Sequence, residues 1–263
     1  MSDLAQLASD YKRDGYVSGV DILSIKEAQD HRRRLEEAER AMGPLHYKAK
    51  MHTVFTSTLG LVTQPKILDV VEALIGPDIL LYDSEYIIKE PDTPSFVSWH
   101  QDLTYWGLSD DAQVSLWLAL SPATAQSGCM RMIAGSHTQG VFTHETSNDA
   151  DNVLLQSQTV NGVDEADAAM CPLEPGQASF HHGWTLHASM PNISPDRRIG
   201  VNAQFIAPHV RQTKHDKDTT MLVRGEDRYG HFSYDRPARA DFEPSALPRW
   251  RELSAQQVAT QGT

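Results

Sequence analysis

The segment VSLWLAL at residues 114–120 decides the fold class of this chain. Aliphatic side chains occupy every second position of the segment, which stops at Ser121-Pro122. This alternation predicts a β-strand with one face in a core. Further short segments rich in strand formers, with turn residues between them, occupy residues 79–82, 86–89, 130–133, 177–181 and 199–205. Such a series predicts a sandwich or barrel.

The residues before this series predict helices. Apolar residues recur at helical spacing between Leu4 and Tyr11. Ser24 and Glu27 fit a capping box that opens a helix running to Met42. A third helix is predicted to begin at Pro65 and to stop at Gly76.

We therefore expect one domain over residues 1–263, mainly β with flanking helices. It divides into a helical cover at 1–77, a β core at 78–206 and a C-terminal extension at 207–263. Residues 137–170 are polar and lack periodic apolar positions, which predicts a long loop or lid within the core.

Composition narrows the class of partner. The formal net charge is −12, from 23 Lys and Arg against 35 Asp and Glu, which argues against nucleic acid or an anionic membrane as the partner. The chain has two cysteines, no apolar stretch resembling a signal peptide and no run long enough to span a bilayer. We expect a cytoplasmic protein, monomeric or homodimeric, that acts on a small molecule.

Three residues in two distant segments predict a metal site. His100 and Asp102 flank one residue, so on a strand both would point to the same face. Alone this pattern is weak, since His100 could equally be a core histidine, but His187 adds a second imidazole. Two histidines and one carboxylate form the facial triad of non-heme Fe(II) oxygenases. Arg198 follows His187 by 198 − 187 = 11 residues and could clamp a carboxylate-bearing co-substrate.

The wider pattern resembles a known family. Residues 187–198 match H-x-S-x-x-N-x-S-x-x-x-R, and SGCM at 127–130 is followed by AGSH at 134–137. LEPG at 173–176 is followed by Phe180-His181. Together these blocks, over residues 80–206, resemble the phytanoyl-CoA dioxygenase family of Fe(II)- and 2-oxoglutarate-dependent oxygenases.

The resemblance implies a double-stranded β-helix, a cupin-like jelly roll, with Fe(II), 2-oxoglutarate and O2 as the reacting partners. It implies that the iron ligands are His100, Asp102 and His187. It also implies that Arg198 pairs with the far carboxylate of 2-oxoglutarate, with Ser189, Gln101 and Trp117 close by. Either Lys48 or Lys50 is expected to be an additional contact from the N-terminal region. His181 and His182 are competing candidates for the second histidine ligand, although the motif selects His187.

The activity expected from this resemblance is hydroxylation of an unactivated C–H bond in a small metabolite or natural-product intermediate, with release of succinate and CO2. Asp102 stands where halogenating relatives carry a small residue, which favours hydroxylation over halogenation. Candidate substrate contacts are Glu85, Tyr105, Trp106, Met130 and His182. The alternatives are a zinc hydrolase that uses the same triad and a non-catalytic ligand-binding barrel.

Overall fold

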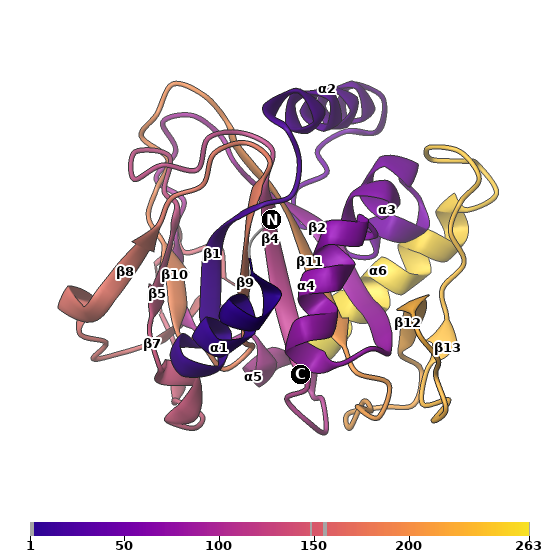
Figure 1. The fold of residues 1–263 in the computed structure, drawn as a ribbon. Coiled ribbons are helices and arrows are strands. Elements are labelled where there is room, and N and C mark those ends of the chain that lie inside the picture. Colours follow the sequence, from indigo (N-terminus) through magenta and orange to yellow (C-terminus); the bar gives the residue numbers. More distant parts are fainter. Residues whose placement is uncertain (1–2, 148, 155–156, 263) are drawn as a thin grey trace.

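A computed structural model describes residues 3–147, 149–154 and 157–262 of the chain. Within these ranges the strands form a seven-stranded sheet, ordered β1-β9-β4-β11-β2-β12-β13, and a four-stranded sheet, ordered β3-β10-β5-β8. In Figure 1, β5, β8 and β10 lie to the left of β1, β4 and β9, whereas α3, α4 and α6 lie to the right of these three strands. Two sheets with helices on the outside confirm the predicted mainly β, jelly-roll class.

The strands of the larger sheet are β1 (Tyr16–Asp21), β2 (Ile79–Lys89), β4 (Gln113–Ala119), β9 (Gln177–His181), β11 (Arg198–Ile206), β12 (Thr219–Arg224) and β13 (Ser233–Tyr234). Those of the smaller sheet are β3 (Val97–His100), β5 (Met130–Ile133), β8 (Ala168–Cys171) and β10 (His187–Ser189). A separate pair consists of β6 (His144–Thr146) and β7 (Gln158–Val160). The helices are α1 (Leu4–Asp14), α2 (Ile25–Met42), α3 (Thr56–Val62), α4 (Pro65–Ile75), α5 (Leu103–Trp106) and α6 (Leu247–Gln261), with short 3-10 turns at Met51–Thr53, Ser136–Thr138 and Glu165–Asp167.

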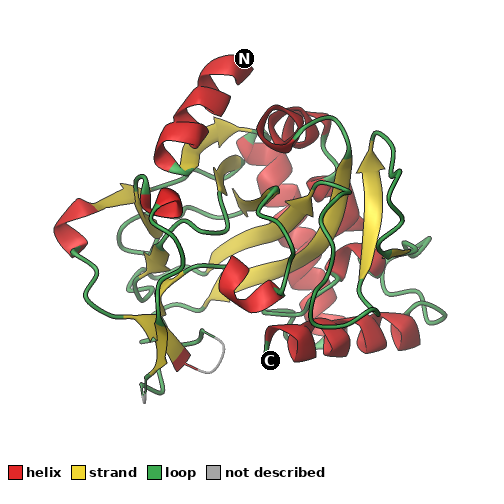
Figure 2. Cartoon of the chain, turned by 90° about the horizontal axis from the view of Figure 1, so that it is seen from below, coloured by secondary structure: helices red, strands yellow, loops and turns green. Residues whose placement is uncertain are grey.

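The predicted helices form where their terminal residues satisfy free backbone groups. The Ser24 hydroxyl accepts from the Glu27 amide at 3.3 Å, and the Glu27 carboxylate accepts from the Ser24 amide at 2.7 Å. This reciprocal pair is the predicted capping box at the start of α2. Gly15 ends α1 in the left-handed region at φ 82°, which glycine adopts without a steric penalty. Figure 2 shows α1 and α6, the first and last helices, at opposite edges of the molecule.

The larger sheet packs one face on the helices and turns the other toward the smaller sheet. Along β11 the apolar residues Ile199, Val201 and Phe205 belong to the main core, together with Ile67 and Val71 of α4. The alternate residues of β11 include Asn202 and Gln204, which line a cavity between the two sheets. The period of two therefore directs the apolar residues to the helices and the polar residues to the cavity.

Several boundaries differ from the sequence predictions. Residues 79–82 and 86–89 belong to one continuous strand, β2, and two of the three polar residues between them, Asp83 and Ser84, are hydrogen-bonded in place. The Asp83 carboxylate accepts from the Lys50 amide at 2.6 Å, and the Ser84 hydroxyl accepts from the His52 amide at 3.0 Å. Because these two buried side chains accept hydrogen bonds, the strand can continue through them.

The cover, loop and extension also contain more regular structure than expected. The predicted helical cover includes β1, which pairs with β9 at the edge of the larger sheet. The predicted loop at 137–170 contains β6 and β7, and the extension supplies β12, β13 and α6. No helix in the described ranges is long and apolar enough to cross a membrane.

Candidate metal and dicarboxylate site

Two histidines on neighbouring strands meet at the inner face of the smaller sheet. His187 on β10 lies directly opposite His100 on β3, and their ring centroids are 4.0 Å apart. The Nδ1 of His100 donates to the Ser98 carbonyl at 2.8 Å, and that of His187 donates to the Thr185 carbonyl at 2.9 Å. Because a carbonyl can only accept, both Nε2 atoms are left with a free lone pair, as a metal ligand requires.

The Asp102 carboxylate completes the cluster. Its Oδ1 lies 3.4 Å from His100 Nε2 and 3.6 Å from His187 Nε2, and the three ligand atoms all lie within 4.8 Å of one another. Its Oδ2 accepts from the Ser115 hydroxyl at 2.8 Å and from His181 Nε2 at 3.2 Å. One oxygen therefore faces the histidine pair while the larger sheet holds the other.

Asp102 reaches this position from a turn, which corrects the strand expected for the pair. Strand β3 ends at His100, and Asp102 has right-handed helical backbone angles directly before α5. The predicted proximity to His100 is present, but it comes from the start of a helix and not from the pleat of a strand.

The charges at the cluster favour a cation. Burial alone would raise the pKa of Asp102, but the neighbouring His187, His100 and His181 hold it well below its usual value. Burial and the nearby His100 lower the pKa of His187 well below its usual value. An ionised carboxylate beside a neutral imidazole is the protonation state that binds a divalent metal.

The triad opens onto a cavity of about 340 Å³ that Arg198 also lines. Arg198 is 1% exposed, and its guanidinium forms no hydrogen bond or ion pair with any residue in the described ranges. Burial lowers its pKa to about 10, which still leaves it charged near neutral pH. A buried cation without a partner is costly, so the cavity is suited to an anionic group of a ligand.

Trp117 and Gly200 position the guanidinium. The Arg198 guanidinium carbon lies 4.3 Å from the centroid of the Trp117 ring, within the range of a cation–π contact. The indole lies over Gly200 so closely that a Cβ added there would fall 2.1 Å from Trp117 Cζ2. Glycine at position 200 is therefore the residue that lets the indole lie flat against β11.

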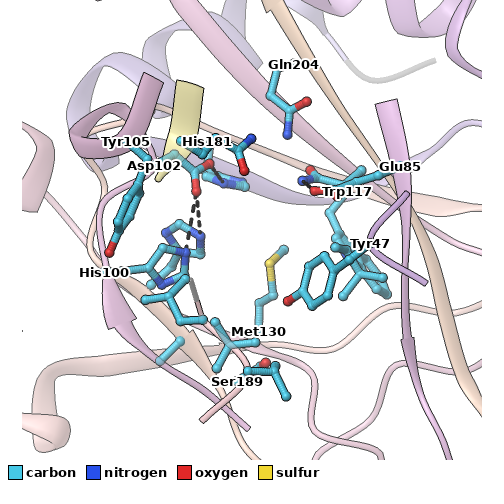
Figure 3. Close-up of a pocket in the computed structure, with 18 of the residues that line it drawn as sticks. Tyr47, Glu85, His100, Asp102, Tyr105, Trp117, Met130, His181, Ser189 and Gln204 are labelled. Carbon is cyan, nitrogen blue, oxygen red and sulfur yellow. Dashed lines mark hydrogen bonds and ion pairs between the residues drawn. The ribbon is translucent and has the colours of Figure 1, made fainter. Parts of the chain in front are cut away.

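A second basic residue lies beside Arg198. Lys89 is opposite Arg198 in the β2–β11 ladder, and its side-chain amine donates to the Ser189 hydroxyl at 2.8 Å and to the Met190 carbonyl. Burial and the charge of Arg198 lower the pKa of Lys89 to about 6. Tyr47 also lines the cavity (Figure 3). The two basic side chains thus come from facing positions of β2 and β11, and Arg198 lines the cavity together with the triad.

The structure brings most of the sequence candidates to this cavity. Its lining includes the proposed triad together with Arg198, Ser189, Trp117, Glu85, Tyr105, Trp106 and Met130. In Figure 3, His100, Asp102 and Tyr105 lie on one side of it, and Glu85, Trp117 and Tyr47 on the other.

Gln101 and His182 do not line the cavity, and both predictions are corrected. The Gln101 amide nitrogen donates to the carbonyls of Gly140 and Trp184, and its oxygen accepts from the Phe142 amide. Gln101 therefore fastens the 137–170 segment to the core. The Nδ1 of His182 accepts from the Trp184 amide at 3.1 Å, and its Nε2 lies 3.8 Å from Asp111 Oδ2.

Neither candidate lysine faces the cavity. Lys48 is exposed. Lys50 is buried elsewhere, where its ammonium donates to the Tyr82 and Thr219 carbonyls at 2.6 Å and pairs with Asp235 at 3.3 Å. The N-terminal residues that do line the cavity are Tyr47 and Ala49. Residues 47–50 lie in turns, with Tyr47 and Lys50 at positive φ (52° and 59°), and this backbone directs Tyr47 and Ala49 to the cavity in place of the expected lysines.

Sequence reasoning missed several residues of the site because their roles depend on strand register. Ser115 holds the outer oxygen of Asp102, Lys89 holds Ser189, and Asn202 and Gln204 line the cavity. The sequence indicates for one of His181 and His182 either a competing ligand or a residue that orients one, and in the structure His181 contacts Asp102 Oδ2 and lines the cavity. The alternation of polar residues along 198–204 was the available indication for Asn202 and Gln204.

Comparison with known proteins gives a family match. The family model described as phytanoyl-CoA dioxygenase (PhyH) matches residues 11–200. Among curated relatives, the probable alpha-ketoglutarate-dependent hypophosphite dioxygenase of Stutzerimonas stutzeri is 28% identical over 180 residues, which cover 66% of this chain and 63% of that protein. The 1-deoxypentalenic acid 11-beta-hydroxylase of Streptomyces arenae is 30% identical over 144 residues, which cover 50% of each chain. The matches thus span less than two thirds of either relative.

Among solved structures, the apo form of the non-heme monooxygenase ThoJ matches with a TM-score of 0.85 and 30% sequence identity. This match covers 97% of the present chain and 98% of that one. The similarity therefore extends to β1, β12, β13 and α6, which lie outside the stretch of sequence that carries the motifs.

Proposed function

The chain belongs to the phytanoyl-CoA dioxygenase family, and from that premise we propose that it is an Fe(II)- and 2-oxoglutarate-dependent dioxygenase. The proposed reaction converts a small molecule R–H, 2-oxoglutarate and O2 into R–OH, succinate and CO2. Bound iron supplies the redox chemistry of this reaction. The residues of the chain supply position, charge and exclusion of water.

The observation that carries the proposal is the buried guanidinium of Arg198, which has no hydrogen-bond or ion-pair partner among the described residues and lines the same cavity as a two-histidine, one-carboxylate cluster. The donor set suits iron, since His100, Asp102 and His187 offer two imidazole nitrogens and one carboxylate oxygen. The cation suits the far carboxylate of 2-oxoglutarate, because a guanidinium can donate two parallel hydrogen bonds to it.

The neighbouring residues complete the proposed co-substrate pocket. Lys89 holds Ser189 by a hydrogen bond, and Trp117 holds the guanidinium plane. Ser115 and His181 orient Asp102 so that one oxygen faces the iron site. Asp102 occupies the position that halogenating relatives leave open, which favours hydroxylation.

The zinc hydrolase alternative is not supported. Hydrolysis would leave Arg198 without a role, whereas the relatives and the solved structure that match are named as oxygenases.

We also propose a cytoplasmic location, which two free, buried cysteines fit. A small-molecule substrate, rather than nucleic acid, fits the net charge of −12. The monomeric or homodimeric state remains a prediction.

The test is a pair of measurements on the purified chain with Fe(II). Anaerobic calorimetry should show 2-oxoglutarate binding to the wild type. Arg198→Gln should weaken that binding by about 100-fold or more, since a buried charge pair is broken, while Fe(II) affinity is retained. With O2 admitted, succinate should appear. Absence of 2-oxoglutarate binding in the iron-loaded wild type would refute the proposal.

A further inference from the structure

Glu85 is a carboxylate on the cavity wall formed by the larger sheet. It lies on β2 directly opposite Asn202 of β11, which in turn lies opposite Trp117 of β4. Both Glu85 and Asn202 line the cavity, and Figure 3 places Glu85 across it from His100 and Asp102. The carboxyl group therefore faces the space between the sheets from the side opposite the metal cluster.

Among the residues that the structure describes, Glu85 has no cation to pair with. Its one hydrogen bond within the described ranges comes from the Asn202 amide, at 3.4 Å from Oε1. The charged groups that act on it are the carboxylates of Asp83 and Asp102, both of its own sign. Burial and these two carboxylates raise its pKa above the usual value for a glutamate. Arg198 forms no ion pair with Glu85 in the described ranges, and its guanidinium is stacked on the Trp117 indole.

Glu85 is the acidic side chain that the strands of the larger sheet contribute to the cavity lining. A ligand group that binds to its carboxylate must bring N–H or O–H donors, and a positive charge would also compensate the buried negative charge. An ammonium group, with three donors and a positive charge, meets both conditions.

We propose that the substrate of this enzyme carries a basic nitrogen, bound as an ammonium by Glu85. The inference rests on the proposed dioxygenase function, because it assigns Arg198 to 2-oxoglutarate and leaves Glu85 for the substrate. It also fits the position of the wall, since an ammonium anchored there extends its carbon skeleton across the cavity toward the metal cluster. The net charge of −12 would favour the approach of a cationic substrate.

The test compares three six-carbon probes that differ only in their head group: hexylamine, hexan-1-ol and hexanoate. Each is titrated calorimetrically into the anaerobic chain loaded with Fe(II) and 2-oxoglutarate. The wild type should bind hexylamine about tenfold or more tightly than hexan-1-ol, as expected for a hydrogen bond to a charged group. Hexanoate should bind most weakly.

Two variants carry the same change in charge. Glu85→Gln should abolish the preference for hexylamine and leave hexan-1-ol binding within about twofold, because the amide keeps the shape but not the charge. Glu174→Gln, at an exposed position, should leave all three affinities unchanged. An equal affinity for amine and alcohol in the wild type would overturn the proposal. So would a preference for amine that survives in Glu85→Gln.

Titration of 2-oxoglutarate into the wild type and each variant distinguishes failure of the substrate inference from failure of the proposed dioxygenase function. If 2-oxoglutarate binds and the amine preference is missing, the substrate class is wrong and the dioxygenase proposal stands. If 2-oxoglutarate fails to bind the iron-loaded wild type, the dioxygenase proposal itself fails.

Discussion

Substitution of Gly200 by alanine tests whether the indole of Trp117 sets the position of Arg198. The added Cβ would lie 2.1 Å from Cζ2 and 2.2 Å from Cε2 of Trp117. Ordinary contact begins at 3.4 Å, so the ring must retreat by 3.4 − 2.1, or about 1.3 Å. Neighbouring strands hold Gly200 on both sides, opposite Ile87 of β2 and Ala119 of β4, so its backbone has little freedom to move instead.

Two magnitudes follow from this displacement. Overpacking of a close-packed interior costs about 1–3 kcal/mol, which should appear as a lower free energy of unfolding in urea. The Arg198 guanidinium lies over the displaced ring at 4.3 Å from its centroid. A desolvated cation–π contact is worth about 2 kcal/mol, so its complete loss would weaken 2-oxoglutarate binding by about 30-fold in anaerobic calorimetry.

A rescue and a control sharpen this prediction. Trp117→Phe removes the part of the indole that meets the new Cβ, so the double variant with Gly200→Ala should regain most of the lost stability. The two changes should therefore be non-additive. Gly60→Ala, in α3 with no atom near its new Cβ, should be neutral or slightly stabilising. If Gly200→Ala matches Gly60→Ala in both unfolding and 2-oxoglutarate binding, the reasoning is wrong.

Three other changes test the supports of the site and of the extension. Ser115→Ala removes the hydroxyl that donates to Asp102 at 2.8 Å and should weaken Fe(II) binding about tenfold or more, measured by competition with a chelator; an unchanged affinity would remove Ser115 from the metal site. Lys89→Met leaves the Ser189 hydroxyl and the Met190 carbonyl without their donor and should lower the free energy of unfolding by about 1–3 kcal/mol, measured in urea; a variant as stable as the wild type would contradict this. Asp235→Asn breaks the buried pair with Lys50 and should cost about 3 kcal/mol of stability at pH 7. Although burial alone would raise the pKa of Asp235, Lys50 holds it below its usual value, so this stabilisation is present above about pH 4, where unfolded aspartate is ionised. It is lost as the pH falls through the lower folded pKa, and a stability difference that instead grows in acid would refute the assignment.

The sequence predicted the reacting groups better than their local structure. His187 and Arg198 were identified by the motif they share, and both line one cavity. Asp102 was predicted beside His100 by strand alternation, yet it reaches that place from the turn before α5. A spacing of two residues is short enough that a strand and a turn both bring the side chains together, so the proximity was predicted although the backbone was not.

Features that depend on register could not be predicted. Glu85 and Asn202 are neighbours only because β2 and β11 pair with one particular alignment, and nothing local to either segment specifies that alignment. Gln101 failed for a related reason, because a glutamine between two ligands can turn toward the cavity or toward a loop. The loop contacts at Gly140 and Phe142 lie far along the chain and decide between the two.

The division of the site between the two sheets has a thermodynamic consequence. His100 and His187 belong to the smaller sheet, whereas Arg198 belongs to the larger one. A molecule held by the metal at one end and by Arg198 at the other would act as a removable brace between two separately hydrogen-bonded layers. Binding of this molecule would then raise the free energy of unfolding, by about 2.7 kcal/mol when its free concentration is 100 times its dissociation constant. Slower amide hydrogen exchange in both β10 and β11 after addition of this molecule would show that it links the two sheets, and this measurement requires no knowledge of the substrate.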